Sequence, residues 1–244
     1  MHQTDFFEPD TDAATLFWPI QSPDGKKMTA SDNNSTGQCC ILPADSKHLD
    51  GMVRCHILSF PGEFMTLVGA RFIKGFYKFY MRENAIVFVA VSSGRVVGLV
   101  CGGEPGLRQK FSRRYGLLYA SDIMLSVMRS GYARRRLLHH VGQLIERLFR
   151  IFSSASRSRN CSSEDIQCRW SSLLSVCTAP EFRNMGAGAA LMKRFEEESR
   201  ARGYKAMRLS AHKDNATAIK FYKKCSCEVV FESDAGVYFR KNLS

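Results

Sequence analysis

The stretch 183–189, Arg-Asn-Met-Gly-Ala-Gly-Ala, combines residue types that suit the binding of a phosphate group. It follows an apolar run that ends at Pro180 and precedes a helix-forming segment, so its glycines lie where a helix begins. The first amides of a helix have no intrahelical acceptor, and the helix dipole adds partial positive charge there. Gly186 and Gly188 would let phosphate oxygens approach these amides without meeting a Cβ atom, and Arg183 would add a charged donor. The stretch predicts an anion-binding turn; a turn that packs a helix closely onto a sheet is the alternative.

The wider sequence predicts the elements that would hold this turn in place. Apolar residues at spacings of three and four indicate helices, and short runs of β-branched and aromatic residues indicate strands. The expected order is strand 39–44, helices 46–60 and 62–82, hairpin 86–103, a basic helical region 123–152 with a loop to residue 165, strand 168–178, helix 186–202, strand 204–212, helix 215–224, and strands 227–232 and 236–242. This order predicts a mixed α/β fold of the α+β kind, with a mostly antiparallel start and a β-α-β unit in the second half.

Length and composition are those of one domain with appendages. The chain has 244 residues, 45% of them hydrophobic, which is enough for a sizeable core. It contains no run of 18 or more uncharged apolar residues, and its first residues are acidic where a signal peptide would be basic and then apolar. We therefore expect an intracellular, cytoplasmic protein whose nine cysteines are reduced thiols. No pair of CxxC elements is present to hold zinc, so no metal site is expected.

The net charge of +12 is unevenly spread along the chain. Residues 1–37 hold six acids and two bases among many polar residues, which predicts a disordered acidic segment before a domain at 38–244. Residues 107–165 are expected to form a basic helical insertion, since 107–159 holds twelve bases against Asp122 and Glu146. One interpretation is a packed helix with a solvated basic face. The other is a surface for an anionic partner, namely a nucleotide-sugar acceptor, a cofactor phosphate, nucleic acid or an acidic membrane.

Several motifs in the second half of the chain occur in a fixed order. They are Pro180, Arg183, Gly186 and Gly188 in the turn, FEEESRARGY at the end of the helix, Asn215 with Ala218, and Phe221 with Tyr222. In this order and spacing the chain resembles the acetyl-coenzyme A binding core of the GNAT N-acetyltransferase superfamily, closely over 171–244 and more loosely back to residue 39. A Rossmann dinucleotide site is disfavoured, because no G-x-G-x-x-G follows the first strand. The resemblance implies the GNAT fold, a mostly antiparallel central sheet flanked by helices.

The resemblance also implies roles for individual residues. Val176, Cys177 and Thr178 would lie beside the pantetheine arm of acetyl-CoA, where a backbone N–H would polarise the thioester carbonyl. The pyrophosphate would be held by Arg183, Asn184, Met185, Gly186, Ala187, Gly188 and Ala189. Asn215 would contact the pantetheine or cap the helix that follows it, and both roles are compatible. Tyr222 would be the catalytic residue, whose hydroxyl protonates the departing thiolate; a buried aromatic that packs on the sheet is the alternative.

Two local departures from the family pattern concern the geometry of turns. Members usually have a glycine and a small basic or polar pair where this chain has Asn184 and Met185. They end the tyrosine-bearing helix with Gly-Phe where this chain has Ser226 and Cys227. Cofactor binding would survive both changes, because the backbone amides remain.

A third departure concerns the general base that must take a proton from the attacking amine. Relatives often place a glutamate near the start of the central strand, where this chain has Ser171 and Ser172. Glu63, between the first two helices, and His212, at the end of its strand, are candidates for the base. A chain of waters, or an amine that arrives neutral, would serve equally.

The function that these features predict is N-acetyl transfer from acetyl-CoA to a primary amine, by direct attack within a ternary complex. An amino sugar or another small amine is the favoured acceptor, because a similar basic insertion occurs in GNAT enzymes of sugar and polysaccharide modification. The first alternative is a catalytically impaired CoA-binding module that docks on RNA or an anionic membrane through its basic helix. The second is a protein or peptide N-acetyltransferase. The sequence leaves the oligomeric state open, a homodimer included.

Overall fold

The computed structural model describes residues 16–19, 38–129, 169–234 and 236–243. Their strands form one eight-stranded sheet in the order β1-β2-β3-β4-β5-β6-β8-β7. The strands are β1 Leu16–Pro19, β2 Gln38–Pro43, β3 Ile86–Ser92, β4 Arg95–Gly103, β5 Trp170–Thr178, β6 Ala206–His212, β7 Glu228–Glu232 and β8 Gly236–Asn242. Neighbouring strands pair antiparallel except β5 and β6, which run parallel. The mixed, mostly antiparallel sheet expected from the sequence is confirmed.

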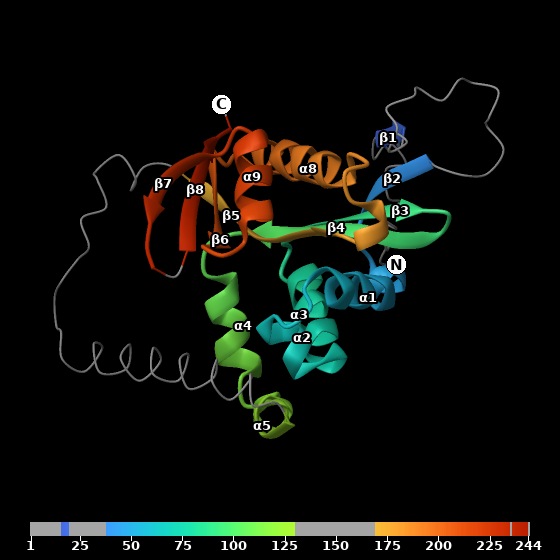
Figure 1. Cartoon of the computed structure of the whole chain (residues 1–244), viewed down its shortest axis with the longest axis vertical. Helices are drawn as coiled ribbons and strands as arrows, with labels where there is room; N and C mark the ends of the chain where they lie inside the picture. The colour runs from blue at the N-terminus through green and yellow to red at the C-terminus, as the bar shows by residue number, and fades with distance from the viewer. Residues whose placement is uncertain (1–15, 20–37, 130–168, 235, 244) are drawn as a thin grey trace, which may run out of the picture.

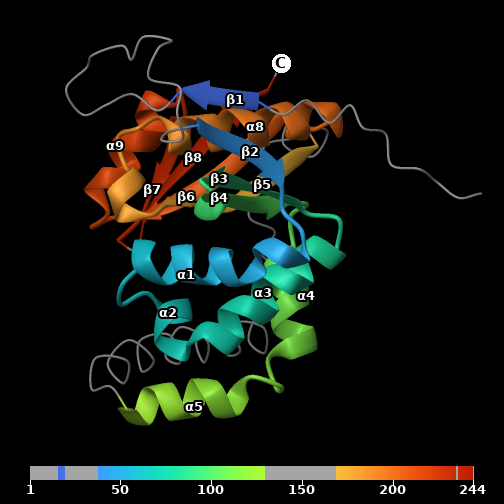
Figure 2. The same ribbon diagram turned by 90° about the vertical axis from the view of Figure 1, so that its right-hand side faces the viewer.

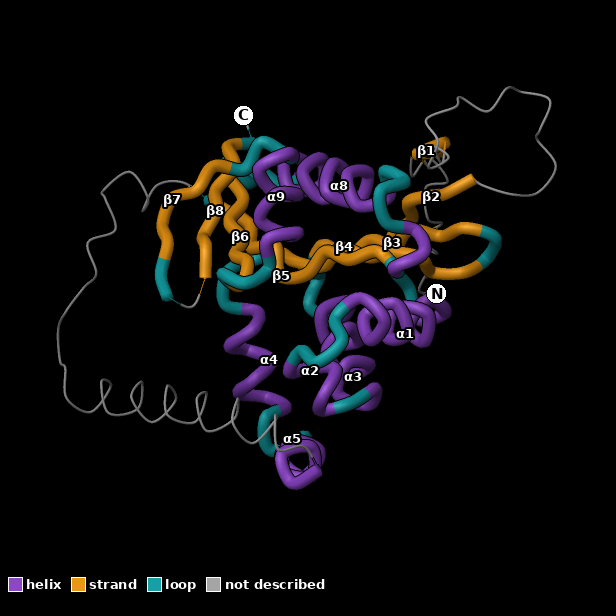
Figure 3. Tube along the Cα trace, viewed as in Figure 1, coloured by secondary structure: helices purple, strands orange, loops and turns teal. Residues whose placement is uncertain are grey.

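Helices cover both faces of this sheet (Figures 1 and 2). On one face lie α8 Ala187–Ala201 and α9 Ala216–Lys224, and on the other lie α1 Leu49–Ser59, α2 Phe64–Val68 and α3 Ala70–Arg82. The helices α4 Leu107–Tyr115 and α5 Ala120–Arg129 lead away from the end of β4. Short 3-10 turns, η1 Ser46–His48 and η2 Pro180–Phe182, precede α1 and follow β5. Figure 3 shows the loop that carries the chain from β5 over to α8, on the opposite side of the sheet from α1.

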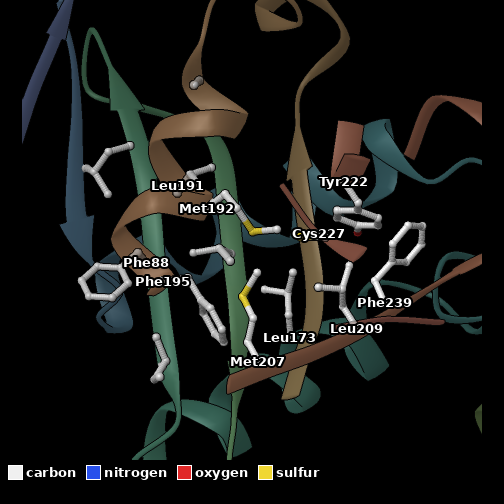
Figure 4. Packing of buried hydrophobic residues seen from close by; sticks show 14 of the residues in the cluster. Phe88, Leu173, Leu191, Met192, Phe195, Met207, Leu209, Tyr222, Cys227 and Phe239 are labelled. Carbon is white, nitrogen blue, oxygen red and sulfur yellow. The ribbon is translucent and has the colours of Figure 1, made fainter. Parts of the chain in front are cut away.

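Two apolar layers fix the central strand β5 from both sides. The layer under α8 contains Phe88, Leu173, Leu191, Met192, Phe195, Met207, Leu209 and Phe239 (Figure 4). The layer under α1 and α3 contains Met52, Ile73, Phe76, Tyr77, Tyr80, Val89 and Leu99. Because Leu173 packs in the first layer and Cys177 in the second, β5 cannot shift without disturbing both.

The expected helix 62–82 is wrong in one respect, because the chain breaks it in two. Gly69 has φ of 116°, a conformation that residues with a Cβ atom rarely adopt, and it ends α2 and begins α3. The apolar spacing continues across the break, which is why the sequence pattern did not reveal it. The hairpin, the helix after the glycine turn and the last strands all form where the sequence predicted them.

Within the acidic segment 1–37, the four residues Leu16–Pro19 form β1 and pair with β2, which differs from the expected disorder at these positions. Apolar and aromatic residues there can join the free edge of β2 despite the polar surroundings. In the insertion 107–165, the structure describes the two short helices α4 and α5. The predicted amphipathic helix to residue 152 and the loop after it lie largely outside the described residues.

Candidate functional site

The parallel strands β5 and β6 separate after three pairs of residues. Trp170 to Ser172 pair with Ala206 to Arg208, and the pairing stops there although both strands continue. The strand β5 stays paired with β4 as far as Thr178, and β6 stays paired with β8 as far as His212. The sheet therefore opens at its middle, and we call this opening the β5–β6 separation.

The free edge of β5 in this separation presents backbone groups of Val176 and Thr178. The amide of Ala179 donates to the Val97 carbonyl across to β4 at 2.8 Å. Because the backbone groups of successive residues in an antiparallel ladder point to alternate edges, Cys177 also faces β4, whereas Val176 and Thr178 face the β6 side. An extended ligand with amide groups could pair with this edge as an added strand would.

The end of β5 leads into a tight turn whose backbone begins α8. Asn184 has φ of 62° and Gly186 has φ of 87°, so two of the turn residues are left-handed. Asparagine tolerates this conformation, which explains how the chain makes the turn without the usual glycine at that place. Gly186 is the N-cap of α8 and no side chain caps the helix. The amides of Ala187, Gly188 and Ala189 therefore have no intrahelical acceptor and are available to an anion.

Gly188, in the first turn of α8, lies close to two other elements of the site. A Cβ atom at Gly188 would lie 3.5 Å from the ring of Phe221 and 3.9 Å from Cγ2 of Thr178, which is ordinary contact. The start of α8, the end of β5 and the helix α9 thus meet at this glycine. A side chain longer than a methyl group would project into the same region.

Tyr222 of α9 faces the separation from the α8 side. Its side chain is 8% exposed and packs on Phe239, with ring centroids 5.5 Å apart (Figure 4). Burial raises the pKa of the Tyr222 hydroxyl well above its ordinary value, and the thiols of Cys227, Cys225 and Cys177 add to the rise. Tyr222 therefore stays protonated near neutral pH, and donation of its proton to a thiolate stays a prediction.

Comparison with known proteins agrees with this geometry. The profile of the Acetyltransferase (GNAT) family matches residues 162–226, which include the free edge of β5, the glycine turn and Tyr222. Residues 162–226 are therefore similar to the GNAT acetyltransferase family. No curated protein matches the chain.

Solved structures of N-acetyltransferases share the fold of this chain. One from Staphylococcus aureus Mu50 is 12% identical, with a TM-score of 0.50 over 84% of this chain and 99% of its own. PaiA N-acetyltransferase of Thermoplasma acidophilum, solved in complex with coenzyme A, is 11% identical, with a TM-score of 0.51 over 84% and 98%. A polyamine N-acetyltransferase of Drosophila melanogaster, which forms N-acetylagmatine, is 10% identical, with a TM-score of 0.50 over 84% and 99%. At these identities the likeness establishes the fold alone.

Asn215 is the N-cap of α9. Its Oδ1 accepts a hydrogen bond from the Ala218 amide at 3.0 Å. The capping role expected from the sequence is confirmed, and the contact with pantetheine stays a prediction. Fixing the start of α9 in this way also fixes the direction in which Tyr222 points, two turns further on.

The end of α1 forms the other wall of the separation, which sequence analysis did not predict. Ser59 Oγ donates a hydrogen bond to the Thr178 carbonyl at 3.0 Å, and Arg183 donates to the Ser59 carbonyl at 3.3 Å. Arg183 therefore ties the turn to α1 in addition to any contact with phosphate. One turn earlier, Cys55 Sγ lies 4.0 Å from Cys177 Sγ. No local motif marks these residues, because their partners lie more than 100 positions away in the sequence.

A buried polar pair lies beneath β5 on the same side. The Nδ1 atom of His56 and the hydroxyl of Tyr77 are 2.7 Å apart, with the side chains 4% and 0% exposed. Burial lowers the pKa of His56 from 6.5 to about 4, so the imidazole is neutral at pH 7. Burial raises the pKa of Tyr77 far above its ordinary value. The buried Oγ of Ser175 on β5 has no hydrogen-bond partner among the described residues. The only feature of the sequence that could have indicated this pair is His56 itself, a histidine on the apolar face of the predicted helix 46–60.

Three positions bear on the general base: Ser171, where relatives often have a glutamate, and the two candidates Glu63 and His212. Ser171 is fully buried, and its Oγ lies 3.0 Å from Ser199 Oγ, so it fastens β5 to α8. Glu63 is the exposed residue before α2, and His212 is exposed at the end of β6, with Nδ1 3.5 Å from Asp214 Oδ2. The assignment of the base to Glu63 or His212 stays a prediction.

Within the ranges that the structure describes, no three His, Cys, Asp or Glu side chains are grouped as metal ligands. None of the helices in those ranges combines the length and the apolar character needed to cross a bilayer. The seven cysteines among the described residues are all free, as expected for those positions.

Proposed function

We propose that this protein is an N-acetyltransferase that binds acetyl-CoA and a primary amine together and transfers the acetyl group directly. The observation that carries the proposal is the meeting of three features at the β5–β6 separation. These are the edge of β5 at Val176 and at the amide of Thr178, the uncapped start of α8 at Gly188, and the hydroxyl of Tyr222. Each suits a different part of acetyl-CoA, namely the pantetheine amides, the pyrophosphate and the sulfur.

The proposed reaction assigns one task to each group. The amine nitrogen attacks the thioester carbonyl carbon, and a backbone N–H of the β5 edge stabilises the negative charge that develops on the oxygen. The carbon–sulfur bond then breaks, and Tyr222 gives its proton to the departing thiolate. The attacking nitrogen loses a proton to solvent or to a base, for which Glu63 and His212 remain our candidates. Rate enhancement comes largely from holding the two substrates together.

The test is a thiol-release assay with acetyl-CoA and a panel of acceptors. The panel contains amino sugars, polyamines, amino acids and peptides with free N-termini, and release is compared with a reaction that lacks the acceptor. We expect saturable release with at least one class, together with a product that is heavier by one acetyl group. Binding of acetyl-CoA without release for any class would contradict the proposal.

That outcome would support the alternative of a CoA-binding module without chemistry. The observation that favours this alternative is the Ser171–Ser199 contact at 3.0 Å, which fills the start of the central strand with a structural pair. An amino sugar or another small amine remains our favoured acceptor. Release that is confined to peptides would favour the protein N-acetyltransferase alternative instead.

The basic insertion is proposed to attract an anionic acceptor. In its described part, α4 presents Lys110, Arg113 and Arg114 around a cavity of about 530 Å³. Lys110 and Arg114 also bind Glu83, which neutralises part of this charge. The arginines 134–136 lie outside the described residues, and Arg→Gln changes there should raise the acceptor's KM and weaken its salt dependence without altering acetyl-CoA affinity.

A further inference from the structure

Two cysteines from distant parts of the chain face each other beside the β5–β6 separation. Cys55 Sγ of α1 and Cys177 Sγ of β5 lie 4.0 Å apart, and the residues are 1% and 7% exposed. A disulfide needs a sulfur separation of about 2.05 Å, so the two sulfurs would have to approach each other by about 2 Å. We propose that Cys55 and Cys177 are a modification site, at which a small hydroperoxide forms a reversible intrachain disulfide.

The surroundings shift the pKa values of the two thiols in opposite directions, which gives the thiols different roles. A hydrogen bond from Cys177 lowers the pKa of Cys55, and Ser59, 4.0 Å away, contributes in the same direction. The same interaction raises the pKa of Cys177, as does its burial. Cys55 is therefore the thiol that more readily forms the reactive thiolate, and Cys177 is the resolving thiol. Because both thiols are buried, a bulky oxidant is disfavoured.

The chemistry proceeds in two balanced steps. The Cys55 thiolate attacks one oxygen of hydrogen peroxide, which forms a sulfenic acid and releases hydroxide. The Cys177 sulfur, on losing its proton, then attacks the Cys55 sulfur and displaces the hydroxyl group. The two thiols are oxidised, the peroxide is reduced to two waters, and a dithiol reductant reverses the result.

The disulfide would act on the proposed acetyl-CoA site, and this part rests on the proposed function. The end of α1 is joined to the cofactor strand through Ser59 and Thr178, and to the glycine turn through Arg183. Drawing the two sulfurs together would move α1 relative to β5 next to the free edge at Val176. We expect acetyl-CoA affinity to fall about tenfold on oxidation, equivalent to 1.4 kcal/mol.

Peptide mapping gives a direct test, because the sequence isolates each thiol. Trypsin should release Cys55 in residues 55–71 and Cys177 in residues 170–183, each without a second cysteine. The full chain is treated with hydrogen peroxide, blocked with N-ethylmaleimide and digested without reductant. We expect the two peptides joined and lighter by two hydrogen atoms, and separate again after dithiothreitol.

Single variants separate the pair from other thiols. Cys55→Ser and Cys177→Ser should each abolish the joined peptides, and Cys55→Ala serves if the first variant folds poorly. Cys101→Ser is the matched control, because Cys101 is equally buried on the neighbouring strand and should leave the link unchanged. Peroxide that leaves both thiols free to react after unfolding, or that oxidises Cys55 to a sulfinic acid without linking it, would overturn the proposal. So would a link from either residue to Cys101.

Acetyl-CoA binding by the reduced and oxidised chains distinguishes the remaining outcomes. A thermal shift with acetyl-CoA that is large in the reduced chain and small in the linked chain supports the coupling. Equal shifts would overturn the coupling while the modification site stands. If the disulfide forms but acetyl-CoA shifts the melting temperature of neither the reduced nor the oxidised chain, the proposed function is contradicted and the disulfide result stands.

Discussion

The two walls of the β5–β6 separation are built in different ways. The wall at the start of α8 consists of consecutive residues, 183–189, and presents backbone amides. The wall at the end of α1 consists of side chains that meet only in the folded chain, such as Cys55, Ser59 and His56. A backbone wall suits a group that every reaction of this class shares, the pyrophosphate. A wall of side chains can carry properties that are particular to this protein, such as the reactivity of the Cys55 thiol and the pH dependence of stability through His56.

Substitution in the backbone wall should have the largest effect. Acetyl-CoA should raise the melting temperature of the parent chain, because a ligand that binds only the folded state stabilises it. Gly188→Val should abolish this rise while the fold remains, since a branched side chain would crowd the first turn of α8, where we propose that the phosphate binds. Differential scanning fluorimetry with and without acetyl-CoA measures both quantities.

Two further variants serve as controls for Gly188→Val. Gly188→Ala adds only a methyl group at ordinary contact distance from Phe221, and should retain part of the shift. Ala201→Val makes a similar change at the exposed far end of the same helix and should retain all of it. A Gly188→Val chain that binds as well as the parent would show that phosphate does not bind at this turn.

The next largest effect is expected at Tyr222, which lies where the two walls meet. Tyr222→Phe keeps the packing on Phe239 and removes the proton, so kcat should fall about 100-fold or more while acetyl-CoA affinity changes little. Steady-state kinetics at a pH where the acceptor amine is neutral give the clearest measurement. Tyr204→Phe, the same change at a buried tyrosine elsewhere, is the control. Parental turnover by the Tyr222 variant would leave the residue as packing.

The same division explains what sequence analysis could and could not predict. The glycine turn, the cap at Asn215 and the place of Tyr222 follow from local rules of helix starts and from the order of motifs. Their neighbours along the chain fix their geometry. The sheet, with its parallel pair in the middle, followed from the alternation of strands and helices over 168–242.

The α1 wall could not be predicted because its contacts are long-range. Cys55 and Cys177 are 122 positions apart, and nothing in either local sequence points to the other. The break at Gly69 was missed for a related reason, since an apolar spacing shows which face is buried and does not show whether the backbone continues as one helix. At Asn184 the sequence departs from the family pattern, which put the geometry of the turn in doubt. In the structure Asn184 adopts a left-handed conformation, so the turn forms without a glycine there.

The stability of the protein should fall at acidic pH because of the buried His56 in the side-chain wall. Because burial lowers the pKa of His56 from 6.5 to about 4, the unfolded chain binds a proton in this pH window that the folded chain does not. Stability should therefore be unaffected by this group above pH 6.5 and fall as pH drops towards 4, by up to about 3 kcal/mol. Urea unfolding at a series of pH values measures the slope.

Matched variants assign the slope to His56. His56→Asn keeps a polar group near Tyr77 and cannot titrate, so its slope between pH 6.5 and 4 should be shallower than that of the parent. Tyr77→Phe removes the hydroxyl at 2.7 Å and leaves the histidine buried, so it should lower stability at pH 7 while keeping the slope. An unchanged slope in the His56 variant would assign acid sensitivity to other groups.

The smallest effect is expected at Ser59, which joins the side-chain wall to the cofactor strand. Ser59→Ala removes the hydrogen bond to the Thr178 carbonyl and should lower the free energy of unfolding by about 1 kcal/mol. Ser210→Ala, at an exposed position of β6, should change it by less than about 0.5 kcal/mol. Acetyl-CoA affinity should change less than in Gly188→Val, because the amides of α8 remain in place and Arg183 still donates to the main-chain carbonyl of residue 59, which alanine retains. If Ser59→Ala weakened acetyl-CoA binding as strongly as Gly188→Val, the side-chain wall would take part in holding the shared cofactor, and the distinction between the two walls would fail.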